Sequence, residues 1–108
     1  MVTVKICGLS SAASVGAALD AGADMVGFVF FEASPRYVDL DQARALGDQV
    51  AGRARKVALT VDADDAALAA IIEAVAPDIL QLHGHETPLR VADVKARFGL
   101  PVLSLIHI

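Results

Sequence analysis

The chain contains one cysteine, Cys7, which ends the apolar stretch VKIC and directly precedes Gly8. A lone cysteine forms no internal disulfide, so it is either a small core residue or a reagent. Gly8 leaves the thiol uncrowded and would let a ligand approach the backbone. Lys5 lies two residues earlier, on the same face of an expected strand, where its ammonium would favour the thiolate. If Cys7 faces a site, Lys5 therefore faces it too.

A second candidate is Arg36, in the stretch SPRYV. Pro35 stiffens this loop, and Ser34 can hydrogen-bond to the loop backbone, so we expect the guanidinium to be held in place. A fixed guanidinium matches the two oxygens of a carboxylate or a phosphate. An arginine in such a loop is more often simply solvated, and the residues alone leave both interpretations open.

The stretch QLHGHE places His83, His85 and Glu86 close together. Two histidines beside a carboxylate could bind a metal, but the sequence offers no further ligand cluster, so we expect no metal site. A polar strand end followed by loop charges is the better interpretation. Asp62 and Asp64 follow another apolar stretch, and we expect them to cap a helix rather than to form an acid–base pair.

Short apolar stretches alternate with helical ones along the chain. The expected strands are residues 2–7, 25–30, 56–61 and 79–83, with a fifth strand opening at residues 101–102. The expected helices begin at Ser10 or Ser11, Asp39, Asp62 or Asp64, and Thr87, and end near residues 21, 51, 76 and 98. Strands joined by helices in this way must be parallel.

A parallel α/β chain of this kind is either an open doubly wound sheet or part of a (β/α)₈ barrel. In both architectures the chemistry lies at the carboxyl ends of the strands. Cys7, the loop after Phe30, Asp62 and His83 all fall at such ends.

The composition limits the possible functions. The 108 residues suffice for one domain, and 56% of them are hydrophobic while 20% are charged, so the chain can bury a core. The net charge of −4 and the lack of a basic cluster argue against binding to nucleic acid or to a membrane surface. No apolar run approaches the roughly 20 residues of a membrane span. A single cysteine and the lack of a signal peptide predict a cytoplasmic protein.

Four stretches together resemble the phosphoribosylanthranilate isomerase family: VKICGL, GADMVGFVFFEASPRYV, KVALTVDADD and PDILQLHGHETP. They occur in the family's order and spacing and cover residues 2–102. The resemblance implies a (β/α)₈ barrel without metal or cofactor, acting on the small molecule phosphoribosylanthranilate in tryptophan biosynthesis. The implied reaction is an Amadori rearrangement of an aldose to a ketose.

The resemblance also implies roles for individual residues. The cysteine that matches Cys7 is the general base, and the arginine that matches Arg36 meets the anthranilate carboxylate. We expect Lys5 and His83 to contact the substrate as well. The general acid is an aspartate that lies beyond residue 108, as do the loops that bind the phosphate.

We therefore interpret residues 1–102 as the amino-terminal half of a barrel, with four βα units and the start of a fifth strand. Residues 103–108, LSLIHI, depart from the family's fifth strand and match the translated end of a transposon used in sequencing libraries, so we expect a non-native tail. We expect residues 1–108 alone to be inactive and to self-associate through open sheet edges.

Two alternatives remain open from the sequence. A related phosphate-binding barrel such as indole-glycerol-phosphate synthase would rely on Lys5 more than on Cys7. A non-catalytic half-barrel that pairs with itself would use neither residue for chemistry.

Overall fold

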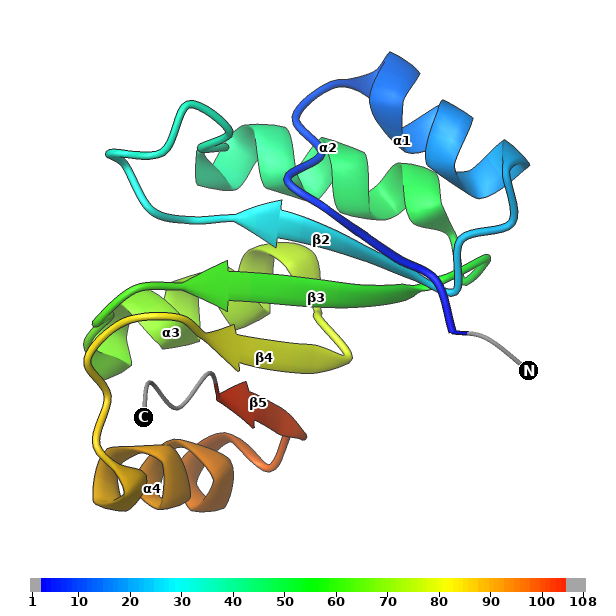
Figure 1. The fold of residues 1–108 in the computed structure, drawn as a ribbon. Coiled ribbons are helices and arrows are strands. Elements are labelled where there is room, and N and C mark those ends of the chain that lie inside the picture. Colours follow the sequence, from blue (N-terminus) through cyan, green and yellow to red (C-terminus); the bar gives the residue numbers. More distant parts are fainter. Residues whose placement is uncertain (1–2, 105–108) are drawn as a thin grey trace.

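The computed structural model describes residues 3–104 and consists of alternating strands and helices (Figure 1). The elements are β1 (Lys5–Cys7), α1 (Ala12–Asp20), β2 (Met25–Val29), α2 (Leu40–Val50), β3 (Arg55–Thr60), α3 (Asp65–Val75), β4 (Ile79–Leu82), α4 (Pro88–Phe98) and β5 (Val102–Ser104). The predicted order βαβαβαβαβ is confirmed. The predicted strand ends differ slightly: β1 is shorter than predicted, and β2 and β4 end one residue before Phe30 and His83.

Each helix begins at a residue whose side-chain oxygen accepts a hydrogen bond from a backbone N–H three residues later. The four caps are Ser11, Asp39, Asp64 and Thr87. Such a cap satisfies one of the N–H groups that a helix leaves unpaired at its start. Because Asp64 is the cap of α3, the expectation that Asp62 is a helix cap is wrong; its carboxylate has other partners, described below.

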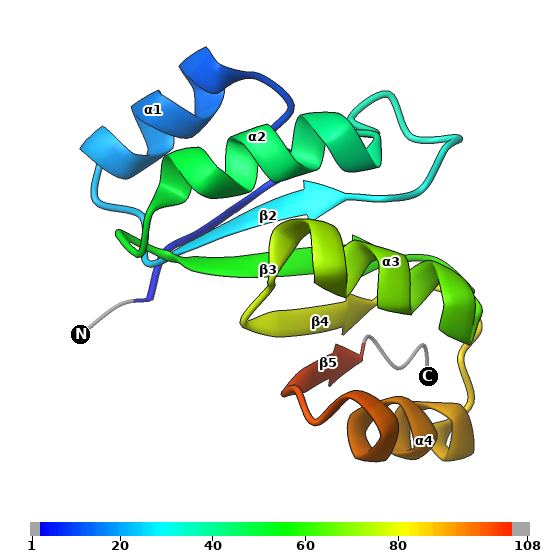
Figure 2. The same ribbon diagram turned by 180° about the vertical axis from the view of Figure 1, so that it is seen from behind.

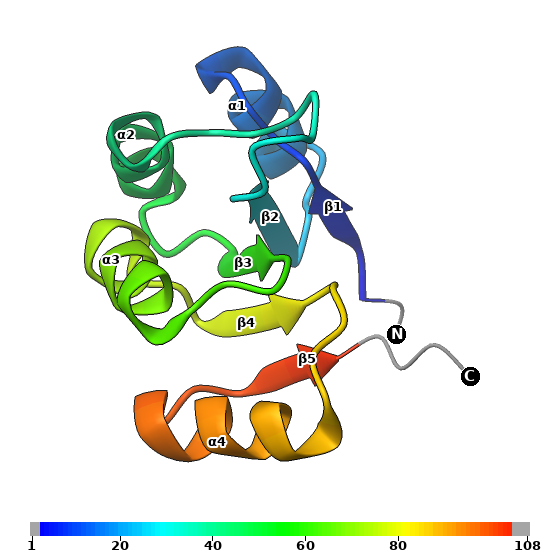
Figure 3. The same cartoon turned by 90° about the vertical axis from the view of Figure 1, so that its left-hand side faces the viewer.

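All five strands are parallel, and their order in the sheet follows the sequence, β1-β2-β3-β4-β5. The sheet is curved, and the helices lie along its outer side (Figure 3). Figure 2 shows α2 and α3 in front of the strands when the molecule is seen from behind, with α1 above them. Since neighbouring strands run in one direction, their carboxyl ends lie together at one edge of the sheet.

The side chains of each strand alternate between the two faces of the sheet. On the outer face, Val26, Phe28, Ala58 and Leu80 are fully buried against the helices. The opposite, concave face carries the aligned row Cys7, Gly27, Val57 and Ile79.

The curvature brings together strands that are not neighbours. Lys5 of β1 donates a hydrogen bond from Nζ to Oε1 of Gln81, on β4, although two strands separate them. Only a strongly curved sheet lets these side chains meet. Val57, Ile79 and Gln81 are buried on this concave face.

The predicted non-native tail, residues 103–108, begins within β5, where Leu103 and Ser104 pair with Gln81 and Leu82 of β4. Its last four residues lie outside the described part of the chain. Within residues 3–104, no helix has both the length and the apolar character that crossing a membrane requires.

Candidate functional site

Cys7 is the last residue of β1, at the carboxyl edge of the sheet. Its side chain is neither fully buried nor fully exposed. The sulfur lies over Gly27, its partner on β2: a Cβ built on Gly27 would come within 3.0 Å of Cys7 Sγ. The glycine on β2 thus makes room for the thiol, and Cys7 is not the fully buried core residue of the simplest interpretation.

Arg36 lies beside Gly8, the residue that follows Cys7. Gly8, which has a φ of +81°, offers a bare backbone surface, and the Arg36 side chain crosses it: a Cβ on Gly8 would be 2.5 Å from Arg36 Cδ. We expected a ligand to approach Gly8, whereas the Arg36 side chain covers it. Gly8 therefore lets the Arg36 side chain, which comes from the loop after β2, approach the backbone just after the carboxyl end of β1.

The loop that carries Arg36 is held as the sequence predicts. The hydroxyl of Ser34 accepts a hydrogen bond from the Arg36 backbone N–H at 3.1 Å, and Tyr37 donates its N–H to the Ser34 carbonyl at 3.1 Å. Val38 then donates its N–H to the Val29 carbonyl at 3.1 Å, which joins the end of the loop to β2. The backbone around Arg36 is thereby fixed, and no carboxylate among residues 3–104 forms an ion pair with its guanidinium.

Lys5 lies on the concave face of β1, two residues before Cys7 and therefore further from the carboxyl edge of the sheet. Its ammonium bonds to the amide oxygen of Gln81, which is 8% exposed. The structure thus gives Lys5 a fixed partner across the concavity. Gln81 was not among the predicted site residues, although its spacing of two from His83 predicts that both share a face.

His83 follows β4, is exposed, and donates its backbone N–H to the Thr60 carbonyl at 2.8 Å. Alternation along β4 places it on the same face as Gln81 and therefore on the side that Lys5 reaches. Strand alternation thus places Cys7, Lys5 and His83 on one face of the sheet. Arg36 packs over Gly8, just after the carboxyl end of β1.

The residues after His83 contact the loop that follows β3. Asp62 accepts the backbone N–H of His85 at 2.6 Å and lies 3.2 Å from His85 Nδ1. The backbone hydrogen bond from His85, followed by the bond from its ring and the attraction of its charge, lowers the pKa of Asp62, although partial desolvation opposes this shift. Glu86 is bound to backbone N–H groups in these same loops. Sequence reasoning missed this arrangement because its partners lie more than twenty residues apart.

The stretch around His83, His85 and Glu86 raised the question of a metal site. The carboxylate oxygens of Glu86 accept two backbone N–H groups instead. In residues 3–104, no group of three or more His, Cys, Asp or Glu side chains is arranged to hold a metal ion.

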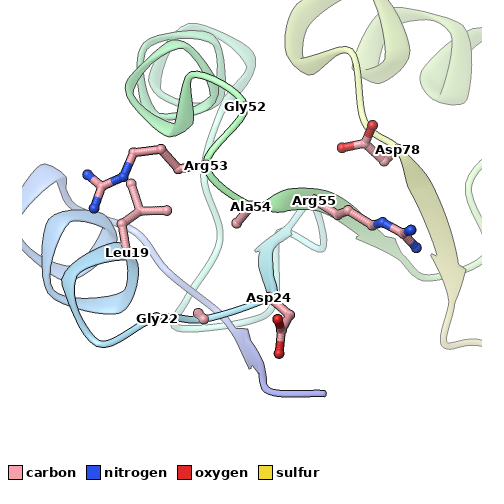
Figure 4. Close-up of a pocket in the computed structure, with 9 residues that line it drawn as sticks. Leu19, Gly22, Asp24, Gly52, Arg53, Ala54, Arg55 and Asp78 are labelled. Atoms are coloured by element: carbon pink, nitrogen blue, oxygen red, sulfur yellow. The ribbon is translucent and has the colours of Figure 1, made fainter. Parts of the chain in front are cut away.

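A hollow of about 460 Å³ lies at the opposite edge of the sheet, at the amino ends of the strands (Figure 4). Asp24, Arg55 and Asp78 contribute to its lining. None of the predicted site residues reaches this edge. It is far from the thiol in the fold because Cys7 ends its strand, whereas Asp24 and Asp78 directly precede β2 and β4.

The chain is similar to known proteins over nearly its whole length. The family model of N-(5'-phosphoribosyl)anthranilate (PRA) isomerase matches residues 4–107. The N-(5'-phosphoribosyl)anthranilate isomerase of Rhodopseudomonas palustris strain BisB18 is 63% identical over 107 residues, which are 99% of this chain and 49% of the relative. The isomerase of Nitrobacter hamburgensis is 63% identical over 105 residues, 97% of this chain and 47% of the relative.

Solved structures give the same result. The crystal structure of phosphoribosyl anthranilate isomerase from Thermotoga maritima superimposes with a TM-score of 0.89 at 29% identity, over 96% of this chain and 50% of that one. A complex of such an isomerase with reduced 1-(o-carboxyphenylamino)-1-deoxyribulose 5-phosphate also gives 0.89, at 29% identity, over 96% of this chain and 53% of that one.

The chain thus spans about half the length of the curated relatives it matches. Its five parallel strands and their outer helices form an α/β fold of the barrel type, which covers about half of each structural neighbour. The chain belongs to the N-(5'-phosphoribosyl)anthranilate isomerase family.

Proposed function

We propose that the full-length protein containing this chain converts N-(5'-phosphoribosyl)anthranilate to its open-chain ketose isomer in tryptophan biosynthesis. The observation that carries the proposal is the Arg36 side chain packed over Gly8, the residue that follows Cys7 at the carboxyl edge of a parallel sheet. A carboxylate-binding guanidinium beside a base suits a substrate that has a carboxylate near its reacting carbons.

The reaction needs a base and an acid. A general acid protonates the ring oxygen of the sugar, the bond between C1 and that oxygen breaks, and a protonated imine forms between C1 and the anthranilate nitrogen. In the proposed mechanism Cys7, as thiolate, then removes the proton from C2. The electrons of that C–H bond form the C1–C2 double bond and neutralise the imine nitrogen. The resulting enol-amine becomes the ketose when C1 gains a proton and the C2 hydroxyl loses its proton to form the carbonyl.

Cys7 is suited to this role by its type and its place. A base works best when its pKa is near the working pH, and a thiol can be tuned into that range. Cys7 lies at a strand end and is partly accessible, so a bound sugar could reach Sγ.

Three further residues are proposed to bind the substrate. Arg36 would hold the anthranilate carboxylate through its two parallel N–H groups. Lys5 and His83 would contact the sugar part of the substrate, since both lie on the concave face. Gln81 accepts a hydrogen bond from the Lys5 ammonium and so holds it in place. We propose no metal or cofactor, because acid–base chemistry and charge suffice for these proton transfers.

We further propose that residues 1–108 alone do not catalyse the reaction. The general acid and the phosphate-binding loops implied by the family lie beyond residue 108, and loss of a general acid alone lowers a rate on the order of 10²–10⁴. The decay of substrate fluorescence tests both proposals, with the full-length protein and residues 1–108 assayed side by side. Turnover by the full-length protein alone is expected. Its failure to turn over would contradict the isomerase, and turnover by residues 1–108 would contradict their inactivity.

Residues 1–108 are also proposed to self-associate. The edge strands β1 and β5 each pair on one side within the described sheet, and exposed Val4 and Leu103 lie at these edges. Unpaired strand edges with apolar side chains promote association. Light scattering during size-exclusion chromatography at micromolar concentration should show species larger than a monomer, and a single sharp monomer peak would contradict this.

The proposed cellular location is the cytoplasm. A chain with one cysteine suits a reducing compartment, in which its thiol stays available as a base. Fractionation of cells that express the full-length protein tests this, and recovery of the protein outside the cytoplasmic fraction would contradict it.

A further inference from the structure

The loops after β3 and β4 are joined by hydrogen bonds that lie outside the strand ladder. Glu86 accepts the backbone N–H of Asp62 at 3.0 Å with Oε2 and that of Gly84 at 2.8 Å with Oε1. Asp62 in turn accepts the N–H of His85 at 2.6 Å with Oδ1. Two carboxylates therefore hold three backbone N–H groups, and each loop supplies an acceptor to the other. We refer to Asp62, Gly84 and Glu86 as the loop clamp.

The loop clamp leaves no space for a side chain at its centre. A Cβ on Gly84 would be 2.5 Å from Asp62 Oδ1 and 2.8 Å from the Asp62 backbone nitrogen. Asp62 itself has a φ of +50°, in the left-handed region that aspartate tolerates better than most residues. The two backbones thus approach closely only because residue 84 is a glycine and residue 62 accepts this conformation.

The loop clamp lies directly beside His83. This residue is tied to β3 through its N–H, which is 2.8 Å from the Thr60 carbonyl, and Gly84 is the next residue of the chain. Since the residues of β4 alternate between the faces, the direction of the His83 side chain depends on where the backbone leaves the strand. A change at Gly84 therefore acts on His83 without passing through any other residue.

We propose that Asp62, Gly84 and Glu86 are positioning residues that fix His83 for substrate binding at the carboxyl edge of the sheet. This inference rests on the proposed isomerase function. The clamp acts through hydrogen bonds between ionised carboxylates and backbone N–H groups, which are stronger than neutral ones. The lowered pKa of Asp62, caused first by the backbone N–H of His85, agrees with an ionised acceptor.

The test compares variants in the full-length protein. Glu86→Ala removes both bonds of the Glu86 carboxylate, and Glu86→Gln keeps only one carbonyl oxygen. His85→Ala is the matched control, because the His85 ring is 96% exposed while its backbone N–H stays available to Asp62. We expect KM for phosphoribosylanthranilate to rise about tenfold in Glu86→Ala, the effect of weakening one substrate hydrogen bond, and less in Glu86→Gln. His85→Ala should stay near the wild type.

Two readouts separate positioning from a loss of folded protein. Unfolding of part of the sample lowers the apparent kcat and leaves KM unchanged, whereas a misplaced binding residue raises KM. Amide hydrogen exchange at Asp62 and Gly84 should quicken in Glu86→Ala but not in His85→Ala. The NMR signals of the His83 ring should shift in the same variant only.

An unchanged KM in Glu86→Ala, or unchanged exchange at Asp62 and Gly84, would overturn the proposal. If Glu86→Ala does not fold, Asp62→Asn and Glu86→Gln allow the same comparison, since both keep the side-chain shape. Absence of turnover in the wild type would contradict the isomerase itself. The exchange rates and the His83 signals would then still decide whether the clamp exists and whether it fixes His83.

Discussion

At the amino ends of the strands, two aspartates extend the sheet, whereas at the carboxyl ends two carboxylates join loops. Asp24 accepts the N–H of Val4 at 2.7 Å and donates its own N–H to the Val4 carbonyl at 2.9 Å. Asp78 does the same with Lys56, at 2.8 Å in both directions. Each aspartate precedes a strand and is bonded to the strand beside it.

The carboxyl edge uses its polar residues differently. The loop clamp bonds the loops after β3 and β4 to each other. At the same edge, after β1, the Cys7 thiol lies over Gly27 and the Arg36 side chain lies over Gly8. Under the proposed function, the amino edge of the sheet would serve stability and the carboxyl edge would serve chemistry. Carboxylates at the amino edge complete the backbone ladder, while those at the carboxyl edge hold loops so that other side chains can face a ligand.

The largest effect is expected at Cys7. Cys7→Ala and Cys7→Ser in the full-length protein should lower kcat on the order of 10²–10⁴, the range for removing a general base. Alanine has no proton acceptor, and the serine hydroxyl scarcely ionises near neutral pH. The melting temperature should change little, because the lost side chain is small and leaves a small cavity. Steady-state kinetics with thermal melts checks this; a large fall in melting temperature with intact kcat would indicate a core residue instead.

The next effect is expected at Arg36. Arg36→Ala should raise KM about ten- to a hundredfold, because charged hydrogen bonds contribute about 1.5–3 kcal/mol. kcat should fall only if the contact tightens in the transition state. Arg36→Lys is the control, since it keeps the charge and loses the paired N–H groups. Equal KM values in all three proteins would show that Arg36 does not bind the substrate.

At the amino edge, Asp78→Ala should act on stability instead of rate. Loss of the bond to the Lys56 N–H should lower the free energy of unfolding by about 1 kcal/mol, or roughly 2–4 °C in melting temperature for a chain of full length. Asp78→Asn keeps an oxygen acceptor and should lose less. Unchanged kcat and KM in both variants are part of the prediction, and a change in either would break the contrast between the two edges.

The smallest effect concerns the ionisation of Asp62. Because the His85 backbone N–H favours the ionised form, the folded-state pKa lies below the unfolded value. The carboxylate therefore stabilises the fold at pH above the unfolded pKa, and this contribution is lost as the pH falls through the folded pKa. Carboxyl-carbon NMR should give a midpoint below that of an ordinary aspartate, and His85→Ala should restore it only in part. A midpoint at the ordinary value would show that the His85 bond is weak in solution.

Much of this arrangement could be predicted from the sequence. The alternating stretches indicate parallel strands. Because Cys7 and His83 lie at the carboxyl ends of such strands, the sequence places both at one edge of the sheet. Helix starts follow from local chemistry, since Ser11, Asp39 and Thr87 each cap the helix that follows. These features depend on residues within a few positions of one another, so the pattern along the chain contains them.

The rest depends on curvature and on loops that meet in space. Lys5 and Gln81 are 76 positions apart and meet because the sheet bends, which no local pattern shows. The loop clamp joins residues that are 24 positions apart. The residues near Asp62 in the sequence do not contain this partner, so they predicted a helix cap instead. The contact of Gly8 with Arg36 likewise depends on the path of a loop. Long-range geometry, rather than residue type, limited the sequence analysis here.

The most direct test of the contrast between the edges measures kcat and melting temperature for Cys7→Ala and Asp78→Ala in one full-length background. We expect a crossed result: Cys7→Ala loses rate and keeps its melting temperature, while Asp78→Ala loses a few degrees, roughly 2–4 °C, and keeps its rate. If Cys7→Ala retains more than about a tenth of the wild-type kcat, less than the smallest loss expected for removing a general base, Cys7 is not the base.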